Sequence, residues 1–413
     1  MHRYTRPSEM EPLLPQSRLP ELSELAGELL RRSSALGGSV NRVTRNSIRE
    51  LLRQMNSYYS NLIEGHQTHP LDIEKALRSD FSGKPKERAL QRESAAHMST
   101  QVKIEQRLEM EPELRIASAE FLCWIHADFY QAMPDEFRVV RGSESNGQRI
   151  VLPGKLRDAD VAVGEHVPPE HSMVPSFLNR FAEIYDPGRL GELERIIACA
   201  ASHHRLAWIH PFLDGNGRVT RLFTHAWLIR CRIAGHGMWM ASRGLARYRE
   251  EYYARLRAAD SPRRGDLDGR GNLSDLGLSE FCEFFLRTAI DQVRFMADLL
   301  DLDSLMRRIA DYVERRAAAG EIEIEAGYLL RETLLRGEVS RGEASRITGL
   351  GERTARKLMA HLEAERLIWS QTPKGPIRIG FPARAVPYYF PRLYPASEEI
   401  GMTGGLSSDL SAR

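Results

Sequence analysis

The sequence has few cysteines, no long hydrophobic run and almost no excess of charge of either sign. It holds four cysteines without any C-x-x-C pair, so neither a zinc knuckle nor a disulfide framework is indicated. We expect reduced core residues at Cys123, Cys199, Cys231 and Cys282. The N-terminus lacks the apolar core of a signal peptide, and no stretch approaches the roughly 18 apolar residues that a membrane span requires. The sequence therefore predicts a cytoplasmic protein with no membrane partner.

The charge balance excludes a chain that coats nucleic acid along its whole length. The 413 residues carry 58 basic and 56 acidic side chains, and 42% of all residues are apolar. This composition is typical of soluble globular proteins, and the length predicts two or three domains. Residues 326–395 stand apart, with twelve basic and six acidic side chains, while the rest of the chain has a net charge of −4. Any nucleic-acid role must therefore be local.

Helical periodicity dominates most of the chain. Residues 1–20 hold four prolines and predict a mobile or extended arm. From Asn46, apolar residues recur every three or four positions, which predicts an amphipathic helix that Gly65 ends. Further helical patterns fill residues 71–133, 174–259 and 279–318.

The patterns predict a mainly α-helical fold: a helical core with a β-hairpin, and a small C-terminal domain. The hairpin signal lies in residues 137–167, where glycine and proline punctuate strand-like sequence. We expect four regions: an N-terminal arm and helical regulatory region over residues 1–110, a core over 111–300, a linker helix and small domain over 301–395, and a disordered tail over 396–413.

Residues 210–221, HPFLDGNGRVTR, concentrate the side chains that carry chemistry. GNG lies between two apolar helical patterns and predicts a helix N-terminus, where backbone N–H groups and the helix dipole attract anions. Arg218 and Arg221 share a face of that helix, where both can bind phosphate. Asp214 can hold a Mg²⁺ ion, and His210 is the nearby group suited to take a proton from a hydroxyl. Together they indicate phosphoryl or nucleotidyl transfer.

The same segment resembles the motif of the Fic family, His-x-Phe-x-Asp/Glu-Gly-Asn-Gly-Arg-x-x-Arg, at every fixed position. Fic proteins transfer AMP from ATP to protein hydroxyls. The resemblance implies that His210 deprotonates the target hydroxyl, that Asp214 binds Mg²⁺ and that Phe212 anchors the loop. It also implies phosphate contacts, with the γ-phosphate at Arg221 and the rest of the nucleotide phosphates at Gly215, Asn216, Gly217 and Arg218.

Two further segments add to the resemblance. Residues 153–169 resemble the family's flap, a β-hairpin whose edge pairs with the target protein, and a polar insert at residues 142–147 precedes it. Residues 250–260 resemble the helix on the adenine side. The implied nucleotide contacts are Val161, Ala162, Val163, Gly164, Tyr252 and Tyr253. Adjacent residues on a helix face different ways, so one tyrosine can instead be core. We interpret His203 and His204, which precede the motif, as packing or capping residues.

SNLIEG, residues 60–65, resembles the inhibitory motif Ser/Thr-x-x-x-Glu-Gly/Asn that many Fic proteins carry. Ser60 and Glu64 are four residues apart and share a helix face. The resemblance implies that Glu64 takes Arg221 from the γ-phosphate, so that ATP binds unproductively. The alternative is an ordinary surface glutamate at a helix end. Some family members use this glutamate to position water for AMP removal, and the sequence does not separate the two directions.

Residues 339–368 read as helix, turn and helix, opened by a capping box of Ser340 and Glu343 and followed by a two-stranded wing. The second helix leaves three basic side chains outward, Arg353, Arg356 and Lys357. This pattern resembles a winged helix-turn-helix domain. Its partner is either DNA or a protein, and both readings stay open.

Together the patterns predict a Fic-type protein adenylyltransferase, an AMPylator that uses ATP and Mg²⁺. It modifies a Tyr, Ser or Thr hydroxyl of a target protein docked at the flap, and Glu64 inhibits it. Two alternatives use the same site, AMP removal and transfer of another phosphate-linked group. A third is a DNA-binding regulator that senses nucleotide. Self-modification and a homodimer also stay open, and the sequence does not name the target.

Overall fold

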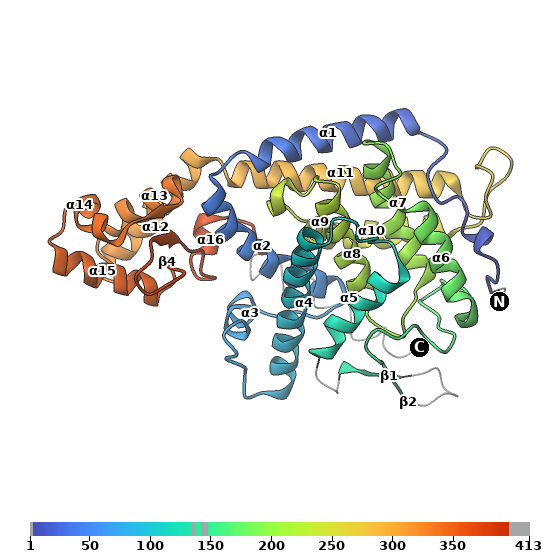
Figure 1. The fold of residues 1–413 in the computed structure, drawn as a ribbon, viewed down its shortest axis with the longest axis horizontal. Helices are drawn as coiled ribbons and strands as arrows, with labels where there is room; N and C mark the ends of the chain where they lie inside the picture. The colour runs from blue at the N-terminus through green and yellow to red at the C-terminus, as the bar shows by residue number, and fades with distance from the viewer. Residues whose placement is uncertain (1–2, 134–136, 142–147, 396–413) are drawn as a thin grey trace. The chain divides into compact units, whose positions relative to one another are not determined.

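The computed structural model describes residues 3–133, 137–141 and 148–395 (Figure 1). They divide into two compact units, one of residues 1–34 and 56–293 and the other of residues 35–55 and 294–413. The expected boundary near residue 110 does not separate these units, because the chain on both sides of it belongs to the first. Residues 35–55 instead group with the C-terminal part of the chain.

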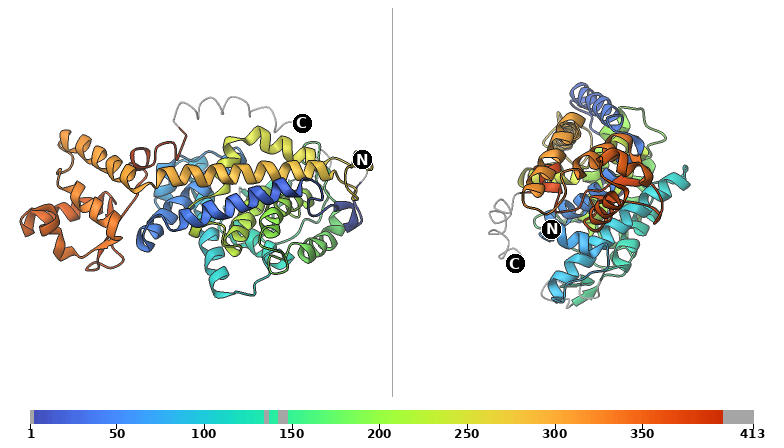
Figure 2. Two further views of the ribbon diagram at one scale, coloured as in Figure 1. Left: turned by 90° about the horizontal axis from the view of Figure 1, so that it is seen from above. Right: turned by 90° about the vertical axis from the view of Figure 1, so that its left-hand side faces the viewer.

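The first unit is built mainly from α-helices, as the periodicity predicted. Its helices are α1 (Leu19–Gly37), α2 (Arg42–Ile63), α3 (Pro70–Ala76), α4 (Pro85–Met110), α5 (Ala119–Gln131), α6 (Val174–Ile184), α7 (Glu194–Ile209), α8 (Asn216–Arg230), α9 (Ala241–Arg247), α10 (Arg249–Asp260) and α11 (Asp275–Leu299). The unit boundaries fall inside α1, α2 and α11. The sequence analysis missed α1, which runs beside α11 (Figures 1 and 2).

Helices α7 and α8 form the centre of this unit. They pack on each other, α4 and α5 pack on α8, and α6 packs on α7. Almost every residue of α7 is buried, which fits the run of apolar and small residues at positions 196–202. The loop that carries the 210–221 motif therefore joins the two most enclosed helices, and its ends are held rigidly.

The N-terminal arm contains a short 3-10 helix, Pro7–Met10, and is packed. Met10 is fully buried, and the Tyr4 ring lies 4.8 Å from the Trp208 ring. Arg205, itself fully buried, donates from Nε and Nη2 to the Pro12 carbonyl oxygen at 3.0 and 2.8 Å. These contacts favour a packed arm, because a buried guanidinium would lose its acceptor if the arm left.

A β-hairpin is present, but it lies earlier than the resemblance placed it. Strands β1 (Val139–Arg141) and β2 (Gln148–Ile150) pair antiparallel, with Val139 opposite Ile150. Residues 153–169 form turns with one isolated bridge, Val163 to His166. Prolines at both ends of this segment cannot donate to a ladder, which opposes regular strands there. The polar insert at residues 142–147 lies outside the described residues.

The second unit contains helices and a small antiparallel sheet. Its elements are α12 (Leu302–Ala318), α13 (Ala326–Arg336), β3 (Glu338–Val339), α14 (Ala344–Thr348), α15 (Glu352–Ala364), β4 (Ile368–Trp369), β5 (Ile377–Ile379) and α16 (Val386–Tyr389). The strand order is β3-β5-β4, so a third strand joins the expected pair. The capping box of Ser340 and Glu343 is confirmed. The tail from residue 396 lies outside the described residues.

All four cysteines are free, and three of them are buried, while Cys123 is partly exposed. Among the described residues, no helix combines the length and the apolar character needed to cross a bilayer.

We predict that Met10→Ala lowers the urea midpoint of unfolding, because truncating a fully buried methionine typically costs about 2–5 kcal/mol. Leu19→Ala is the matched control, since Leu19 is 44% exposed. Circular dichroism during a urea titration measures both variants. Equal midpoints for both would mean that the arm is not packed in solution.

Candidate active site

In the loop of residues 210–217, His210 and Gly215 both adopt the left-handed backbone conformation. His210 ends α7 in the left-handed region, with φ 49° and ψ 62°, and Gly215 caps the start of α8 with φ 78°. A Cβ at Gly215 would lie 2.5 Å from Cε2 of Tyr130, so a larger residue would meet both strain and a clash. The loop is thereby forced to turn sharply into the N-terminus of α8.

Side chains of the motif itself close this loop. Asn216 Oδ1 accepts the Phe212 N–H at 2.9 Å, and Asn216 Nδ2 donates to the Phe212 carbonyl oxygen at 2.9 Å. Phe212 is fully buried and stacks on His126 with ring centroids 4.0 Å apart. The structure thus places Phe212 in the core, and it shows Asn216 holding the loop through its side chain.

His210 is partly buried and fixed through its backbone. Its carbonyl oxygen accepts Nε of Arg157 at 2.8 Å, and the Arg157 N–H donates to the Pro211 carbonyl oxygen at 2.9 Å. Burial lowers the pKa of His210 to about 4, and the charges of His166 and Arg157 add to the shift. The imidazole is therefore neutral at pH 7 and can accept a proton. The sequence analysis did not find Arg157.

Asp214 lies on the exposed side of the loop. Its Oδ2 accepts the Tyr130 hydroxyl at 2.8 Å, and its Oδ1 accepts the Gly215 N–H at 2.7 Å. Burial alone would raise the pKa of the Asp214 carboxyl, but the Arg218 guanidinium and these bonds outweigh burial and lower it. The ionised side chain is 39% exposed.

This carboxylate fits a Mg²⁺ site. Mg²⁺ in proteins usually takes one or two carboxylates together with substrate phosphates and water. The residues that the structure describes contain no group of three or more His, Cys, Asp or Glu side chains suited to a metal ion. Asp214 would therefore act as a single protein ligand, and phosphates and water would complete the shell.

The structure brings Ser60, Glu64 and Arg221 together. Arg221, which is 4% exposed, donates from Nε to Ser60 Oγ at 2.9 Å and from Nη2 to the Ser60 carbonyl oxygen at 2.9 Å. Nη2 also donates to Glu64 Oε1 at 2.6 Å. Burial alone would raise the pKa of the Glu64 carboxyl, but the Arg221 and Arg218 charges hold it below its usual value. These three hydrogen bonds from Arg221 all go to the end of α2.

The Glu64 carboxylate also lies against the first turn of α8. A Cβ added at Gly217 would be 2.1 Å from Glu64 Oε1. A helix N-terminus attracts anions through its free N–H groups and dipole. Glu64 thus occupies the place at which the GNG sequence was expected to receive a phosphate.

The side chains of Tyr252 and Tyr253 on α10 have different partners, because adjacent residues on a helix face different ways. Tyr252 is 3% exposed, and its hydroxyl bonds Nε2 of His203 at 2.8 Å. Tyr253 donates to the Ile63 carbonyl oxygen at 3.2 Å, and Arg249 donates to the same oxygen at 3.0 Å. Tyr252 is therefore a core residue here, and Tyr253 binds the end of the helix that carries Ser60 and Glu64.

His203 and His204 lie in the core. Both are fully buried; Nδ1 of His203 bonds Thr224 Oγ1 at 2.7 Å, and Nε2 of His204 is 3.0 Å from Asp260 Oδ1. Burial lowers the pKa of His203 to about 3. These contacts are those of packing residues.

Residues 161–164 form a largely exposed turn, with Gly164 at φ 59°. The Val163 N–H donates to the His166 carbonyl oxygen at 2.9 Å, and Nε2 of His166 bonds the Trp208 carbonyl oxygen at 2.8 Å. The turn that contains Val161, Ala162, Val163 and Gly164 is thus fixed to the last turn of α7, just before His210.

Four residues near the motif were missed by the sequence analysis: Glu93, His126, Tyr130 and Arg157. Each is polar or aromatic and lies on a buried helix face or in a loop, so nothing in its local pattern marks it. A regular spacing of polar residues on α4 could have indicated Glu93. On α4, polar side chains recur every fourth residue, at Glu93, His97, Gln101 and Glu105, and a polar stripe of this kind on a long helix predicts a buried polar partner.

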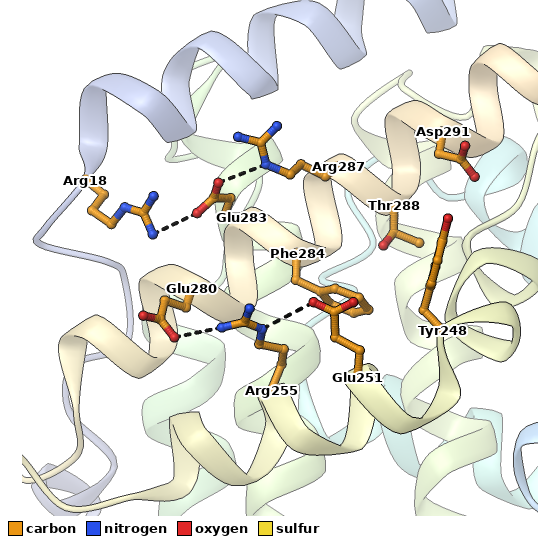
Figure 3. Close-up of a pocket in the computed structure, with 10 residues that line it drawn as sticks. All are labelled: Arg18, Tyr248, Glu251, Arg255, Glu280, Glu283, Phe284, Arg287, Thr288 and Asp291. Carbon is orange, nitrogen blue, oxygen red and sulfur yellow. Dashed lines mark hydrogen bonds and ion pairs between the residues drawn. The ribbon is translucent and has the colours of Figure 1, made fainter.

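An open surface cavity of about 390 Å³ lies apart from the motif, along α10 and α11. Figure 3 shows Glu283 between Arg18 and Arg287, and Arg255 between Glu280 and Glu251. The cavity shares no residue with the 210–221 segment, and six of its seven charged side chains pair with one another. A second cavity, of about 10 Å³ and lined in part by Arg221 and His203, has room for about one water molecule.

Comparison with known proteins identifies the family of this domain. Residues 116–228 match the model of the Fic/DOC family, so a Fic/DOC domain is found in this part of the chain. The chain is 33% identical over 114 residues to the protein adenylyltransferase Fic of Drosophila grimshawi, which covers 28% of this chain and 22% of that protein. It is 40% identical over 80 residues to the protein adenylyltransferase Fic of Nematostella vectensis, and this alignment covers 19% of this chain and 18% of that protein.

The chain therefore matches only about a fifth of the length of these relatives. Among solved structures, Fic-1 (residues 134–508) from C. elegans superposes with a TM-score of 0.50 at 18% identity, over 69% of this chain and 76% of that one. This likeness supports the fold alone.

We predict that the His210 imidazole stays neutral between pH 8 and pH 5, because its pKa is lowered to about 4. Histidine-selective NMR during a pH titration reports this, with His210→Gln identifying the signal. In urea the same signal should titrate near the ordinary histidine value of about 6.5. A midpoint near 6.5 in the folded protein would contradict the buried, cation-flanked position.

Proposed function

We propose that this protein is an adenylyltransferase that moves AMP from ATP to a Tyr, Ser or Thr hydroxyl of a protein. The observation that carries the proposal is a neutral histidine, His210, held beside a helix N-terminus that bears Arg218 and Arg221 on its first turns. The match to the Fic/DOC family and the names of its curated relatives support it.

In the proposed reaction, His210 accepts the proton of the target hydroxyl. The hydroxyl oxygen forms a bond to the α-phosphorus of ATP, and the bond from that phosphorus to the bridging oxygen breaks, so that pyrophosphate leaves. The backbone N–H groups of the first turn of α8 and the two arginines bind the phosphates. Mg²⁺ at Asp214 would supply charge neutralisation on the phosphates.

We also propose that Glu64 inhibits this reaction. Glu64 and the γ-phosphate compete for Arg221, and the Glu64 carboxylate lies where the first turn of α8 would meet an anion. A charge-assisted hydrogen bond contributes about 1.5–3 kcal/mol, which corresponds to about 10- to 150-fold suppression of the competent state. The resting enzyme should accordingly have low activity.

We predict that Glu64→Gly raises AMP incorporation at least tenfold at saturating ATP, and that Glu64→Gln raises it in the same direction because it removes only the charge. Arg221→Ala should not raise it, and Arg221→Ala combined with Glu64→Gly should stay inactive, because the γ-phosphate needs that arginine. Intact-mass spectrometry of the purified protein and of candidate targets measures added AMP.

The Glu64→Gly variant also distinguishes AMP addition from AMP removal. If Glu64 positions water for removal, Glu64→Gly abolishes release of AMP from a modified protein. Equal AMP incorporation by the wild type and Glu64→Gly, on a protein shown to be a target, would rule out the inhibitory role.

We predict that His210→Ala lowers AMP transfer by about 10²- to 10⁴-fold in the Glu64→Gly background, while ATP binding stays near normal. Asp214→Ala should instead remove the Mg²⁺ dependence of ATP binding. Calorimetry with and without Mg²⁺ and a transfer assay distinguish the two roles. Full activity of the His210→Ala variant would remove the histidine from the mechanism.

For the C-terminal unit we propose DNA contact through α15. Arg353, Arg356 and Lys357 are exposed on this helix, and within the described chain only Arg356 has an ion-pair partner, Glu352 at 3.2 Å. The neighbouring acids Glu343, Glu363 and Glu365 pair with other arginines of the same unit. They therefore do not neutralise this face, which leaves it basic and suited to phosphate.

We predict that changing Arg353, Arg356 and Lys357 together to alanine weakens DNA binding and flattens its dependence on salt. The logarithmic slope should fall by about 0.9 for each DNA phosphate that the variant no longer neutralises. Arg307, Arg315 and Arg331 changed together are the control, because they are exposed residues of this unit and remove the same charge. Fluorescence anisotropy across a salt series measures both. No DNA binding by the wild type would favour a protein partner.

A further inference from the structure

Glu93, on α4, is a fully buried carboxylate with two basic partners. Its Oε1 accepts Nη1 of Arg218, and its Oε2 lies 2.8 Å from Nδ1 of His66. A buried carboxylate needs such partners, because an unpaired charge in the interior is costly. Glu93 therefore joins the 210–221 motif to the short segment that follows the inhibitory glutamate.

Arg218 is held on one side and has donors left on the other. It is 5% exposed, and its guanidinium carbon lies 5.5 Å from the centre of the Phe129 ring. Nη2 is 3.7 Å from Asp214 Oδ2, and Nε is buried with no hydrogen-bond partner among the described residues. Glu93 thus fixes the orientation of the guanidinium through Nη1 and leaves Nη2 and Nε for a ligand.

His66 comes two residues after Glu64. Its N–H donates to the Asn61 carbonyl oxygen at 2.9 Å, and its ring meets the ring of Phe137 edge-on at 6.0 Å. The side chain is 34% exposed, so it lies at the rim of the site. The residues after α2 are consequently bound through side chains at two points, Glu64 on Arg221 and His66 on Glu93, in addition to the bonds that Ser60 and Ile63 of α2 accept.

We propose that Glu93 is a positioning residue with two tasks: it orients Arg218 for the nucleotide phosphates, and through His66 it forms a second anchor of the inhibitory segment. The proposal rests on the proposed function, in which Arg218 and Arg221 bind ATP. The first anchor is Glu64 on Arg221, and the second is His66 on Glu93, which binds Arg218. Arg218 and Arg221 lie three positions apart on α8. Movement of the Glu64 segment away from Arg221 therefore also breaks the bond from His66 to Glu93.

The first test removes the anchor without touching the motif. His66→Phe keeps an aromatic ring against Phe137 and loses the bond to Glu93. We expect faster amide hydrogen exchange at the end of α2, residues 58–66, and about three- to tenfold more AMP transfer, the effect of losing one hydrogen bond to a charged group at a partly exposed site. His69→Phe is the control, because His69 lies in the same segment and its side chain bonds only the Leu71 N–H at 3.3 Å among the contacts described.

The effect of His66→Phe should disappear in the Glu64→Gly background. If His66 only holds the segment that carries Glu64, then releasing a segment without its carboxylate gains nothing further. A persistent activation would mean that His66 acts on the substrate directly, and unchanged exchange with unchanged activity would mean that it anchors nothing. Either result overturns the second anchor.

The second test addresses the orientation of Arg218. In the Glu64→Gly background, Glu93→Gln keeps the shape of the side chain and removes its charge. We expect the dissociation constant for ATP, measured by calorimetry, to rise at least fivefold, while that for adenosine, which has no phosphates, stays unchanged. Equal loss for both ligands, or no loss for either, would overturn the positioning role.

These measurements separate this proposal from the proposed function. Hydrogen exchange and the comparison of ATP with adenosine need no transfer of AMP. If both give the expected results and Glu64→Gly still modifies no protein, the anchor stands and the transferase assignment fails.

Discussion

Two buried arginines on the first turns of α8 are the constraint on which the rest of this site depends. Arg218 and Arg221 are 5% and 4% exposed, and a guanidinium cannot lose its charge in a protein. An uncompensated buried charge is costly, so an anion beside each of them stabilises the fold. In this structure the anions are Glu93 and Glu64, one from α4 and the other just past the end of α2.

The pairing of Arg221 with Glu64 bears on the proposed inhibition. Without nucleotide, removal of Glu64 leaves Arg221 with neutral acceptors among the described residues, which include the two Ser60 oxygens. In the proposed inhibition, a nucleotide phosphate would replace the carboxylate, so that one anion would be exchanged for another. The same logic does not apply to Glu93, which is fully buried and has no route to solvent comparable to that of Glu64, whose side chain is 29% exposed. One carboxylate is thus suited to exchange and the other to permanent support.

The local part of this arrangement was readable from the sequence, and the non-local part was not. The spacing of Ser60 and Glu64 placed both on one helix face, and the glycines of the motif marked the start of α8. The partners Glu93, Tyr130 and Arg157 come from distant positions, and pairing across such separations depends on tertiary packing that no local period encodes. The hairpin shows the same limit: its turn residues were found, but the strands formed on the other side of Pro153, at residues 139–141 and 148–150.

The end of α2 also contacts α4 through buried polar side chains. Asn56 donates to Gln101 Oε1 at 2.7 Å, Ser57 donates to the Ser94 carbonyl oxygen at 3.1 Å, and both contacts are buried. Hydrogen bonds between buried polar groups are replaced by bonds to water when an interface opens, so their net contribution is about 1 kcal/mol each, less than the burial of a large apolar side chain. These polar contacts with α4 fix the register of the end of α2, beside the buried side chains of Tyr58 and Ile63.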